Sequence, residues 1–306
     1  MLKPAKFLIF LVTIPMSQGL ENCQNHPRNL TYYKIKSCYK SPSPVAFWKR
    51  VDSLEECYIF AREKSGLGFN FSPADAINLT EVHQPNCQVL ACPETGEISS
   101  LNLNLGYDYY SAYGDLNKTR NATCIKSLGL FTLTKISQNY SQSILACQKK
   151  NGELADVSSE KRTILLSQTI KEKLPGLNNA AFVGLDDIET EGVFRTSFGN
   201  LLTCSKYRAW APGHPRSKFP SEDCVTLDAE QMWRTVKCHQ AKLKALCELY
   251  PQPPSKVEKL PIPANVTCGH IPTKQKVKKR ACFEEKMMFD LYQNASRVDR
   301  CALIDY

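Results

Sequence analysis

The sequence lacks the short motifs that carry much of hydrolytic and nucleotide-dependent chemistry. Its 306 residues contain no Gly-x-Ser-x-Gly, no His-Glu-x-x-His and no phosphate-binding glycine loop. Histidine, the most common general base, is scarce as well, and the five that occur are scattered. They are His26, His83, His214, His239 and His270. The sequence therefore predicts a protein that is not an enzyme.

The sequence also lacks an apolar run of the ~20 residues that a transmembrane helix needs. The N-terminal run Phe7–Ile14 is shorter, follows a basic region and precedes small residues at Ser17 and Gly19. This pattern predicts a secretory signal peptide over residues 1–19. The C-terminal residues Ala302–Tyr306 carry no hydrophobic tail and no retention signal. We therefore expect a secreted, extracellular protein without a membrane span.

Cysteine is abundant instead: fourteen occur, all of them after residue 22. An even number at this density is typical of disulfide-bonded secreted proteins and rare in the cytosol. In that compartment, Cys238-His239 and Cys268-Gly269-His270 favour disulfide bonding over zinc binding. We therefore predict disulfides at these positions and no metal ligands.

Eight Asn-x-Ser/Thr sequons agree with an extracellular location. The candidate glycosylation sites are Asn29, Asn70, Asn78, Asn117, Asn121, Asn139, Asn265 and Asn294. Asn70 stands between two phenylalanines and is expected to be half-buried, so some of the eight will be unused. The sequence nevertheless predicts a glycoprotein with a largely glycan-coated surface.

Residues 20–125 contain six cysteines and form a candidate domain of their own. A helix is predicted over Asp52–Ala61, because Ser53 can cap it and a glutamate stands three residues further on. Phe69–Phe71 and Gln88–Leu90 are predicted to be short strands. A helix tied by disulfides to a small sheet is similar to the PAN/apple module, although that module usually carries two cysteines on its helix. Many pairings are open, and we predict the nested set Cys23–Cys124, Cys38–Cys92 and Cys57–Cys87.

Residues 126–250 alternate between helical and strand patterns, which is typical of an α+β domain. Amphipathic helices are predicted over residues 141–151 and 158–174. Short strands are predicted at residues 181–185, 225–227, 232–233 and 245–249, and a hairpin at residues 192–194.

Several motifs occur within this stretch in a fixed order. They are Ala146-Cys147, Phe182-Val183-Gly184-Leu185, Trp210-Ala211-Pro212-Gly213, and then Cys224, Trp233, Cys238 and Cys247. In this order and at these distances they resemble the framework of the C-type lectin-like domain. The resemblance implies an α+β fold with a long irregular loop and packing roles for both tryptophans. It also implies the disulfides Cys147–Cys247 and Cys224–Cys238.

The residues that hold calcium and sugar in lectins of this family are replaced in this chain. The family carries Glu-Pro-Asn or Gln-Pro-Asp after the Trp-x-Pro-Gly loop, and Trp-Asn-Asp in a later strand. This chain has His214-Pro215-Arg216 and Trp233-Arg234-Thr235. Calcium needs about six to eight oxygen ligands, whereas arginine offers only donors and a positive charge. We expect no cofactor and no usual sugar site, and an accessory calcium at Glu222, Asp223 and Asp228 stays open.

Cations take the place of the expected ligands. The candidate ligand-binding residues are His214, Arg216, Lys218, Arg234 and Lys237. One interpretation is a loop that lost its metal and acquired solvated charges. The other is a surface that recognises an acidic glycan or an acidic protein patch, since arginine pairs bidentately with carboxylate and sulfate.

Residues 251–263 are rich in proline and predict a stiff linker, followed by a basic tail over residues 264–306. One helix is predicted in this tail, around Phe283–Tyr292. Its segment Lys274–Arg280 has five cations in seven positions, either as a solvated run or as a contact for acidic polysaccharide or protein. The tail cysteines are Cys268, Cys282 and Cys301, and Cys204 is surplus to the family pattern. We infer that Cys204 or another surplus cysteine bonds the tail back onto the domain, with an intermolecular bridge as the alternative.

The leading hypothesis is a secreted recognition or adhesion protein. It would bind an extracellular protein or acidic glycan through a lectin-like domain without the usual calcium and sugar residues. Nucleic acid is a poor candidate because the expected compartment rarely presents it. The alternatives are a carbohydrate-binding lectin of innate immunity that uses a non-standard site and, from another class, an enzyme or an enzyme inhibitor.

Overall fold

The computed structural model describes residue 23 and residues 30–73, 85–96, 98–174, 176, 179–216 and 221–254. The expected signal peptide, most of the linker, the tail helix, the tail cysteines and the Lys274–Arg280 run lie outside the described residues. Within the described ranges, no helix is long and apolar enough to cross a membrane.

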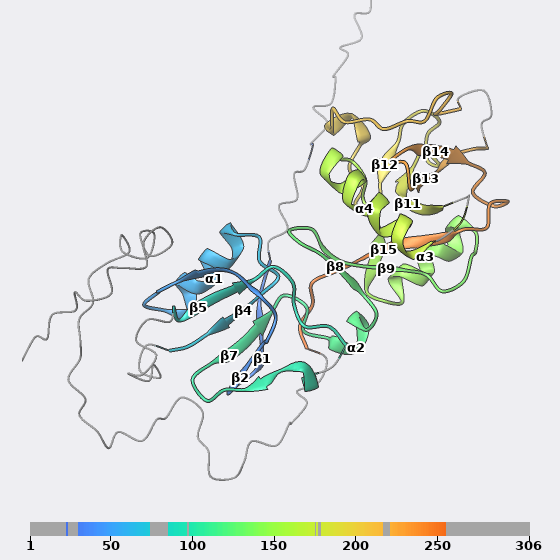
Figure 1. The fold of residues 1–306 in the computed structure, drawn as a ribbon. Helices are drawn as coiled ribbons and strands as arrows, with labels where there is room; N and C mark the ends of the chain where they lie inside the picture. The colour runs from blue at the N-terminus through green and yellow to red at the C-terminus, as the bar shows by residue number, and fades with distance from the viewer. Residues whose placement is uncertain are drawn as a thin grey trace, which may run out of the picture.

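The N-terminal part of the chain folds around a five-stranded antiparallel sheet of order β1-β7-β4-β5-β3, beside a short β2–β6 pair (Figure 1). In its core, Tyr32, Phe69 and Tyr110 make edge and stacked ring contacts at centroid distances of 4.7 to 5.2 Å. The elements are β1 (Tyr33–Lys36), β2 (Tyr39–Lys40), β3 (Val45–Lys49), α1 (Leu54–Glu63), β4 (Gly68–Phe71), β5 (Cys87–Leu90), the 3-10 helix η3 (Ile98–Ser100), β6 (Asn102–Leu103), β7 (Asp108–Ser111) and α2 (Leu116–Thr119).

Helix α1 begins where the capping residues predict it. The Glu56 backbone N–H donates to Ser53 Oγ at 3.2 Å, and the Asp52 N–H donates to Glu56 Oε2 at 3.2 Å. The helix buries Cys57 and Ala61 and packs on β4 and β5. The expected helix and both expected strands of this part are confirmed. The resemblance to the PAN/apple module stays a prediction.

The second part of the chain is built on an eight-stranded sheet whose main order is β14-β13-β11-β15-β9-β8. Strand β10 pairs with β15, strand β12 pairs with β11, and α3 and α4 pack against this sheet (Figure 1). The elements are β8 (Thr123–Ile125), β9 (Gly129–Leu133), α3 (Tyr140–Gln148), β10 (Gly152–Leu154), α4 (Glu160–Lys173), β11 (Ala180–Asp186), β12 (Arg195–Thr196), the 3-10 helix η4 (Leu202–Cys204), β13 (Cys224–Asp228), β14 (Trp233–Val236) and β15 (Lys244–Leu249).

Local signals explain both helices of this α+β part. Asn139 and Gln142 form a reciprocal capping box at the start of α3. Ser159 caps α4, which buries Leu166 and Ile170 at a spacing of one helical turn. The two expected amphipathic helices are therefore confirmed, and the expected strands at residues 181–185, 225–227 and 245–249 lie within β11, β13 and β15.

Glycine is required at position 184 in the middle of β11. A Cβ there would meet Ser197 Oγ and the carbonyl oxygen of Leu154, which already hydrogen-bond to each other at 2.7 Å. The Gly184 N–H donates to the Ala155 carbonyl at 2.8 Å. The glycine of the apolar-Gly-Leu motif therefore allows a neighbouring backbone segment to lie directly against this strand.

The border between the two parts differs from the expected one. Strand β8 pairs with β9 in the second sheet, so the expected border between residues 125 and 126 falls inside a hairpin. Leu130 of β9 and Leu249 of β15 are buried in the core of the N-terminal part. The Leu130 N–H also donates to the Tyr113 hydroxyl at 3.3 Å. The two sheets therefore share packed residues at their junction.

The first residues of the expected linker also belong to this junction. The Gln252 N–H donates to the Ala112 carbonyl at 3.0 Å, and the Gly114 N–H donates to the Gln252 carbonyl at 2.7 Å. Residues 251–254 thus pack along the N-terminal part, although the sequence predicted that they begin a stiff linker.

Five disulfides lie in the described part of the chain. Two, Cys147–Cys247 and Cys224–Cys238, are the pairs that the resemblance implies, and Cys57–Cys87 is the innermost pair of the predicted nested set. The other two are Cys23–Cys204 and Cys92–Cys124.

The predicted pairs Cys23–Cys124 and Cys38–Cys92 are wrong in this structure. The prediction assumed that the first six cysteines belong to one domain, whereas Cys124 lies on β8 of the second sheet. There it bonds to Cys92, which follows β5, with 5.9 Å between the two Cα atoms. Cys23 precedes the first strand and bonds to Cys204 of η4. Two disulfides therefore connect the two parts, and Cys38 is bonded to a residue other than Cys92.

One sequon is incompatible with the fold. Asn70 is fully buried on β4, where its Oδ1 accepts from the Ser41 N–H at 2.8 Å and its Nδ2 donates to the Ser41 carbonyl at 3.3 Å. A glycan on Nδ2 would have no space, so the expectation of a half-buried glycosylation site at Asn70 is wrong. Asn121 is exposed and Asn139 is half-buried. The remaining sites lie outside the described side chains, namely Asn29, Asn78, Asn117, Asn265 and Asn294.

Candidate functional site

The two tryptophans of the motifs hold the long loop against the β13–β14 hairpin. Trp233 is fully buried, and its ring meets the ring of Trp210 edge-on at a centroid distance of 5.3 Å. The backbone of the loop follows them, because the Trp233 N–H donates to Ala209 O at 2.7 Å and the Ala211 N–H donates to Trp233 O at 2.9 Å. Both rings therefore pack, as expected, and β14 determines where the following residues lie.

His214 and Thr235 connect this loop to β14. The Thr235 N–H donates to His214 Nδ1 at 3.0 Å, and the Arg216 N–H donates to Thr235 Oγ1 at 3.1 Å. The peptide bond between His214 and Pro215 is cis. Burial lowers the pKa of His214, and the positive charges of Arg216 and Arg234 lower it further. Both causes disfavour a positive charge on His214, so the cations beside this connection are the two arginines.

The two arginines lie beside carboxylates of the same chain. Arg234 Nε is 3.0 Å from Asp228 Oδ2, and Arg216 is 3.5 Å from Glu222 Oε1. About half of each arginine side chain is exposed, while the two carboxylates are nearly buried. Asp228 Oδ1 also accepts the N–H groups of Glu230 and Met232 in the hairpin turn. The positive charges at the expected ligand positions are therefore largely compensated.

We use the name loop surface for His214, Arg216, Arg234 and their partners. Of the other two candidates, Lys237 is exposed just after β14, and Lys218 lies outside the described residues. Sequence analysis named both the cations and the carboxylates of this surface, but it considered Glu222 and Asp228 for an accessory calcium and did not predict their ion pairs with Arg216 and Arg234.

An acidic group that the sequence analysis did not single out lies at the end of β11. Asp187 is 5% exposed; its Oδ2 accepts from the Gly192 N–H at 2.8 Å, while its buried Oδ1 has no hydrogen-bond partner among the described residues. Burial raises the pKa of Asp187 to about 6, and the negative charges of Glu191 and Asp223 add to the rise. The closely spaced carboxylates from residue 186 to 191 were the signal that could have identified it.

Its neighbour Asp186 is more fully satisfied. The Tyr140 hydroxyl donates to Asp186 Oδ2 at 2.8 Å, and burial is the main cause that raises the Asp186 pKa. In the described ranges, no group of three or more His, Cys, Asp or Glu side chains is arranged to hold a metal ion. Glu222, Asp223 and Asp228 are therefore not brought together as such a group in this structure.

The order of the motifs, the two framework disulfides and the tryptophan packing agree with a comparison of the chain with known families. Residues 136–249 match the family model described as the lectin C-type domain. The chain contains a C-type lectin domain.

The relatives are similar only over this domain. Collectin-10 of Gallus gallus is 30% identical over 118 residues, covering 39% of this chain and 40% of the relative. Collectin-43 of Bos taurus is 26% identical over 122 residues, covering 39% and 36%, and the mannose-binding protein of Gallus gallus is 29% identical over 103 residues, covering 34% and 37%. The matched region thus spans less than half the length of each of these relatives.

Among solved structures, human lithostathine is 23% identical, with a TM-score of 0.38, and covers 42% of this chain and 88% of its own. A calcium-independent type II antifreeze protein is 19% identical, with a TM-score of 0.36, and covers 43% and 93%.

Proposed function

We propose that the protein is an extracellular recognition protein that binds a protein or an acidic glycan through its C-type lectin domain, without calcium at the loop surface. The similarity to collectins and to mannose-binding protein supports a recognition role and a protein that is not an enzyme. Five disulfides in the described residues support an oxidising compartment, which agrees with secretion.

The observation that carries the proposal is the pairing of Arg234 with Asp228 at 3.0 Å. The guanidinium stands where the resemblance places a calcium ligand, and it binds a carboxylate that a metal would otherwise need. A divalent cation beside this arginine would have to displace the ion pair and overcome the repulsion between the two positive charges. Arg216 and Glu222 repeat the arrangement on the loop side.

A second candidate is a carbohydrate-binding lectin that uses a non-standard site. The names of the relatives favour it, and so does Asp187, whose buried Oδ1 has no partner among the described residues. This candidate predicts that sugar binding needs a metal, whereas the leading proposal predicts that it does not.

A glycan array that carries neutral, sialylated and sulfated glycans, probed with and without chelator, tests the two candidates. The leading proposal expects binding to sialylated glycans that chelator leaves unchanged and that Arg216→Gln with Arg234→Gln weakens. The matched control is Lys161→Gln with Lys171→Gln, which removes two exposed charges of α4. Binding to neutral sugars that disappears with chelator would overturn the leading proposal and support the second.

The thermal midpoint provides a second readout of the same question. An ion that binds only the folded chain, at 100 times its dissociation constant, adds about 2.7 kcal/mol to the free energy of unfolding. We expect chelator to leave the Tm unchanged. A clear fall in Tm would show that the carboxylates of the lectin domain assemble into a metal site.

A further inference from the structure

The described surface of the lectin domain has a second cationic region, away from the loop surface. Two cavities of about 540 Å³ and 280 Å³ meet at Thr134, Lys135 and Lys150. Their walls come from β8 and β9, the segment between β9 and α3, helix α3 with the two lysines that follow it, the C-terminal part of α4, and the first residue of β15. We call these two cavities together the lysine groove.

The groove carries one sign of charge. Its described lining contains no aspartate and no glutamate. No carboxylate in the described ranges forms a salt bridge with its lysines. These lysines are Lys135, Lys149, Lys150, Lys173 and Lys244. Because these lysines come from four separate stretches of the chain, no sequence motif identifies them as a group.

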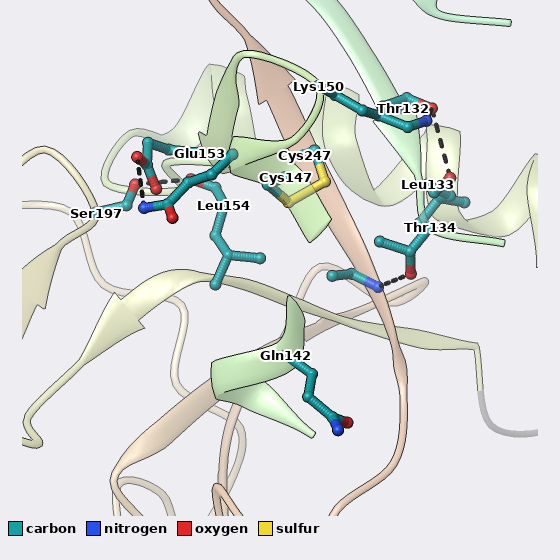
Figure 2. Close-up of a disulfide and its surroundings, with 12 residues drawn as sticks. Thr132, Leu133, Thr134, Gln142, Cys147, Lys150, Glu153, Leu154, Ser197 and Cys247 are labelled. Carbon is teal, nitrogen blue, oxygen red and sulfur yellow. Dashed lines mark hydrogen bonds between the residues drawn. A yellow bond between two sulfur atoms is a disulfide. The ribbon is translucent and has the colours of Figure 1, made fainter. Parts of the chain in front are cut away.

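One lysine is held in place at the centre of the groove. Lys150 Nζ donates to Thr132 Oγ1 at 3.2 Å, and Figure 2 shows its side chain reaching across to that strand. Partial burial lowers the pKa of Lys150, and the positive charge of Lys135 lowers it further. Lys150 is thus a half-buried cation beside a second cation, with no carboxylate in the described lining to compensate its charge. A bound anion would lower the repulsion between the two charges.

The walls of the groove are on rigid elements. The Cys147–Cys247 disulfide joins α3 to β15 beside Lys150 (Figure 2). Thr134 Oγ1 accepts from the Ala245 N–H at 2.9 Å, which ties the start of the β9–α3 segment to β15. A ligand would therefore meet cations whose supporting backbone is already positioned, which lowers the entropy lost on binding.

The rest of the lining favours a sugar chain over a peptide. Ser137, Gln138 and Gln142 supply neutral hydrogen-bonding groups, while Ile136 and Leu145 present apolar surface that is 73% and 57% exposed. A peptide of high affinity needs an enclosed pocket for an aromatic or aliphatic anchor, whereas these two side chains stand on an open rim. The apolar rim matches the faces of sugar rings, and the neutral donors match their hydroxyl groups. The spaced cations match the charged groups of an acidic polysaccharide.

We propose that the lysine groove is a binding site for a sulfated or otherwise multiply anionic glycan chain, distinct from the loop surface. Its two cavities, which meet at Lys135 and Lys150, would hold successive charged sugars, and the inference does not depend on what the loop surface binds. The sequon at Asn121 lies in the wall of the smaller cavity, so a glycan attached there would stand at its edge.

The test is binding of a heparin octasaccharide to the full chain by calorimetry at several salt concentrations, in the native and the Asn121→Gln background. We expect Lys135→Gln with Lys150→Gln to weaken binding at least tenfold and to flatten its salt dependence, because fewer counter-ions are released. Lys135→Arg with Lys150→Arg should restore most of the affinity. Lys161→Gln with Lys171→Gln removes the same charge from exposed positions on α4 and should change little.

The Lys274–Arg280 run also attracts polyanions, so the comparison uses variants that all retain it. The groove is rejected if the octasaccharide does not bind the parent chain, or if the groove variant and the α4 variant lose the same affinity. A groove variant that fails to fold would show a lowered Tm. The arginine variant then decides whether the groove binds the glycan, because the proposal requires it to bind the octasaccharide like the parent chain. If a polyglutamate peptide of equal charge binds as tightly, with the same dependence on Lys135 and Lys150, that result would overturn the glycan as the ligand and assign the groove to an acidic protein.

Arg216→Gln with Arg234→Gln should leave the affinity for the octasaccharide intact. This inference and the proposed function can therefore fail separately.

Discussion

The loop surface and the lysine groove both contain basic residues but differ in what lies beside each one. At the loop surface, Arg216 and Arg234 face Glu222 and Asp228, and burial lowers the pKa of His214. In the groove, the described lining has no carboxylate. Counting cations in the sequence therefore identified the surface whose charge is compensated and passed over the one whose charge is available to a ligand.

The largest effect that separates the two surfaces should come from their disulfides. Cys147–Cys247 spans 100 residues and supports the groove, whereas Cys224–Cys238 spans 14 residues and flanks the hairpin of the loop surface. Replacing the first pair with alanine should lower the free energy of unfolding by about 2–5 kcal/mol. The second replacement should cost about 1–2 kcal/mol less, since the entropy of the unfolded chain depends on loop length.

Denaturant unfolding of both double variants measures this difference. The first variant should also lose affinity for the octasaccharide, while the second should retain it. Equal losses of stability, or loss of octasaccharide binding in the second variant alone, would contradict the assignment of the two disulfides to the two surfaces.

A smaller effect should appear in the pH dependence of the free energy of unfolding. Acidic side chains lie close to one another on the loop side of the domain, whereas the described lining of the groove contains none. The pKa of Asp187 is raised to about 6 in the folded chain, so the folded chain holds this proton more tightly than the unfolded chain. The free energy of unfolding should therefore fall as pH rises from about 4 to about 6, by on the order of 2 kcal/mol. Asp187→Asn should remove this fall.

Urea unfolding between pH 4 and pH 7, with chelator present, measures the slope. Glu230→Gln is the matched control, because it also removes a carboxylate but from an exposed turn. If Asp187→Asn keeps the slope of the parent chain, the raised pKa is not a property of this group.

The smallest effect concerns the ion pair that compensates the loop surface. Asp228→Ala removes the acceptor of the Glu230 and Met232 N–H groups as well as the partner of Arg234. We expect it to cost about 1–3 kcal/mol of stability. Arg234→Gln should cost only about 0–1 kcal/mol, because the arginine is half-exposed. Thermal unfolding of the two variants checks the order, and a larger loss for Arg234→Gln would mean that the arginine is a structural residue.

Sequence patterns predicted best where the determinants are local. Ser53 and Ser159 cap α1 and α4 at the expected positions, because a cap needs only a side chain and the N–H groups of the next turn. The framework of the lectin domain was also predictable, since each of its motifs has one packing role. Two of the three nested cysteine pairs failed for the opposite reason: Cys124 lies five residues before the start of β9 along the chain, and its pairing depends on which sheet β8 joins.

The sequence by itself determined the α+β lectin framework, the residues that stand where the resemblance places calcium ligands, and the capped helices, because these depend on residue identity and short spacing. Only the tertiary structure decided how the charges are arranged. Coulombic interaction depends on distance and burial. The ion-pair partners of Arg216 and Arg234 come from segments that meet only when the chain is folded. The same holds for Lys150, which has no carboxylate beside it in the described lining of the groove. The burial of Asn70 and the Cys92–Cys124 connection between the two parts have the same origin.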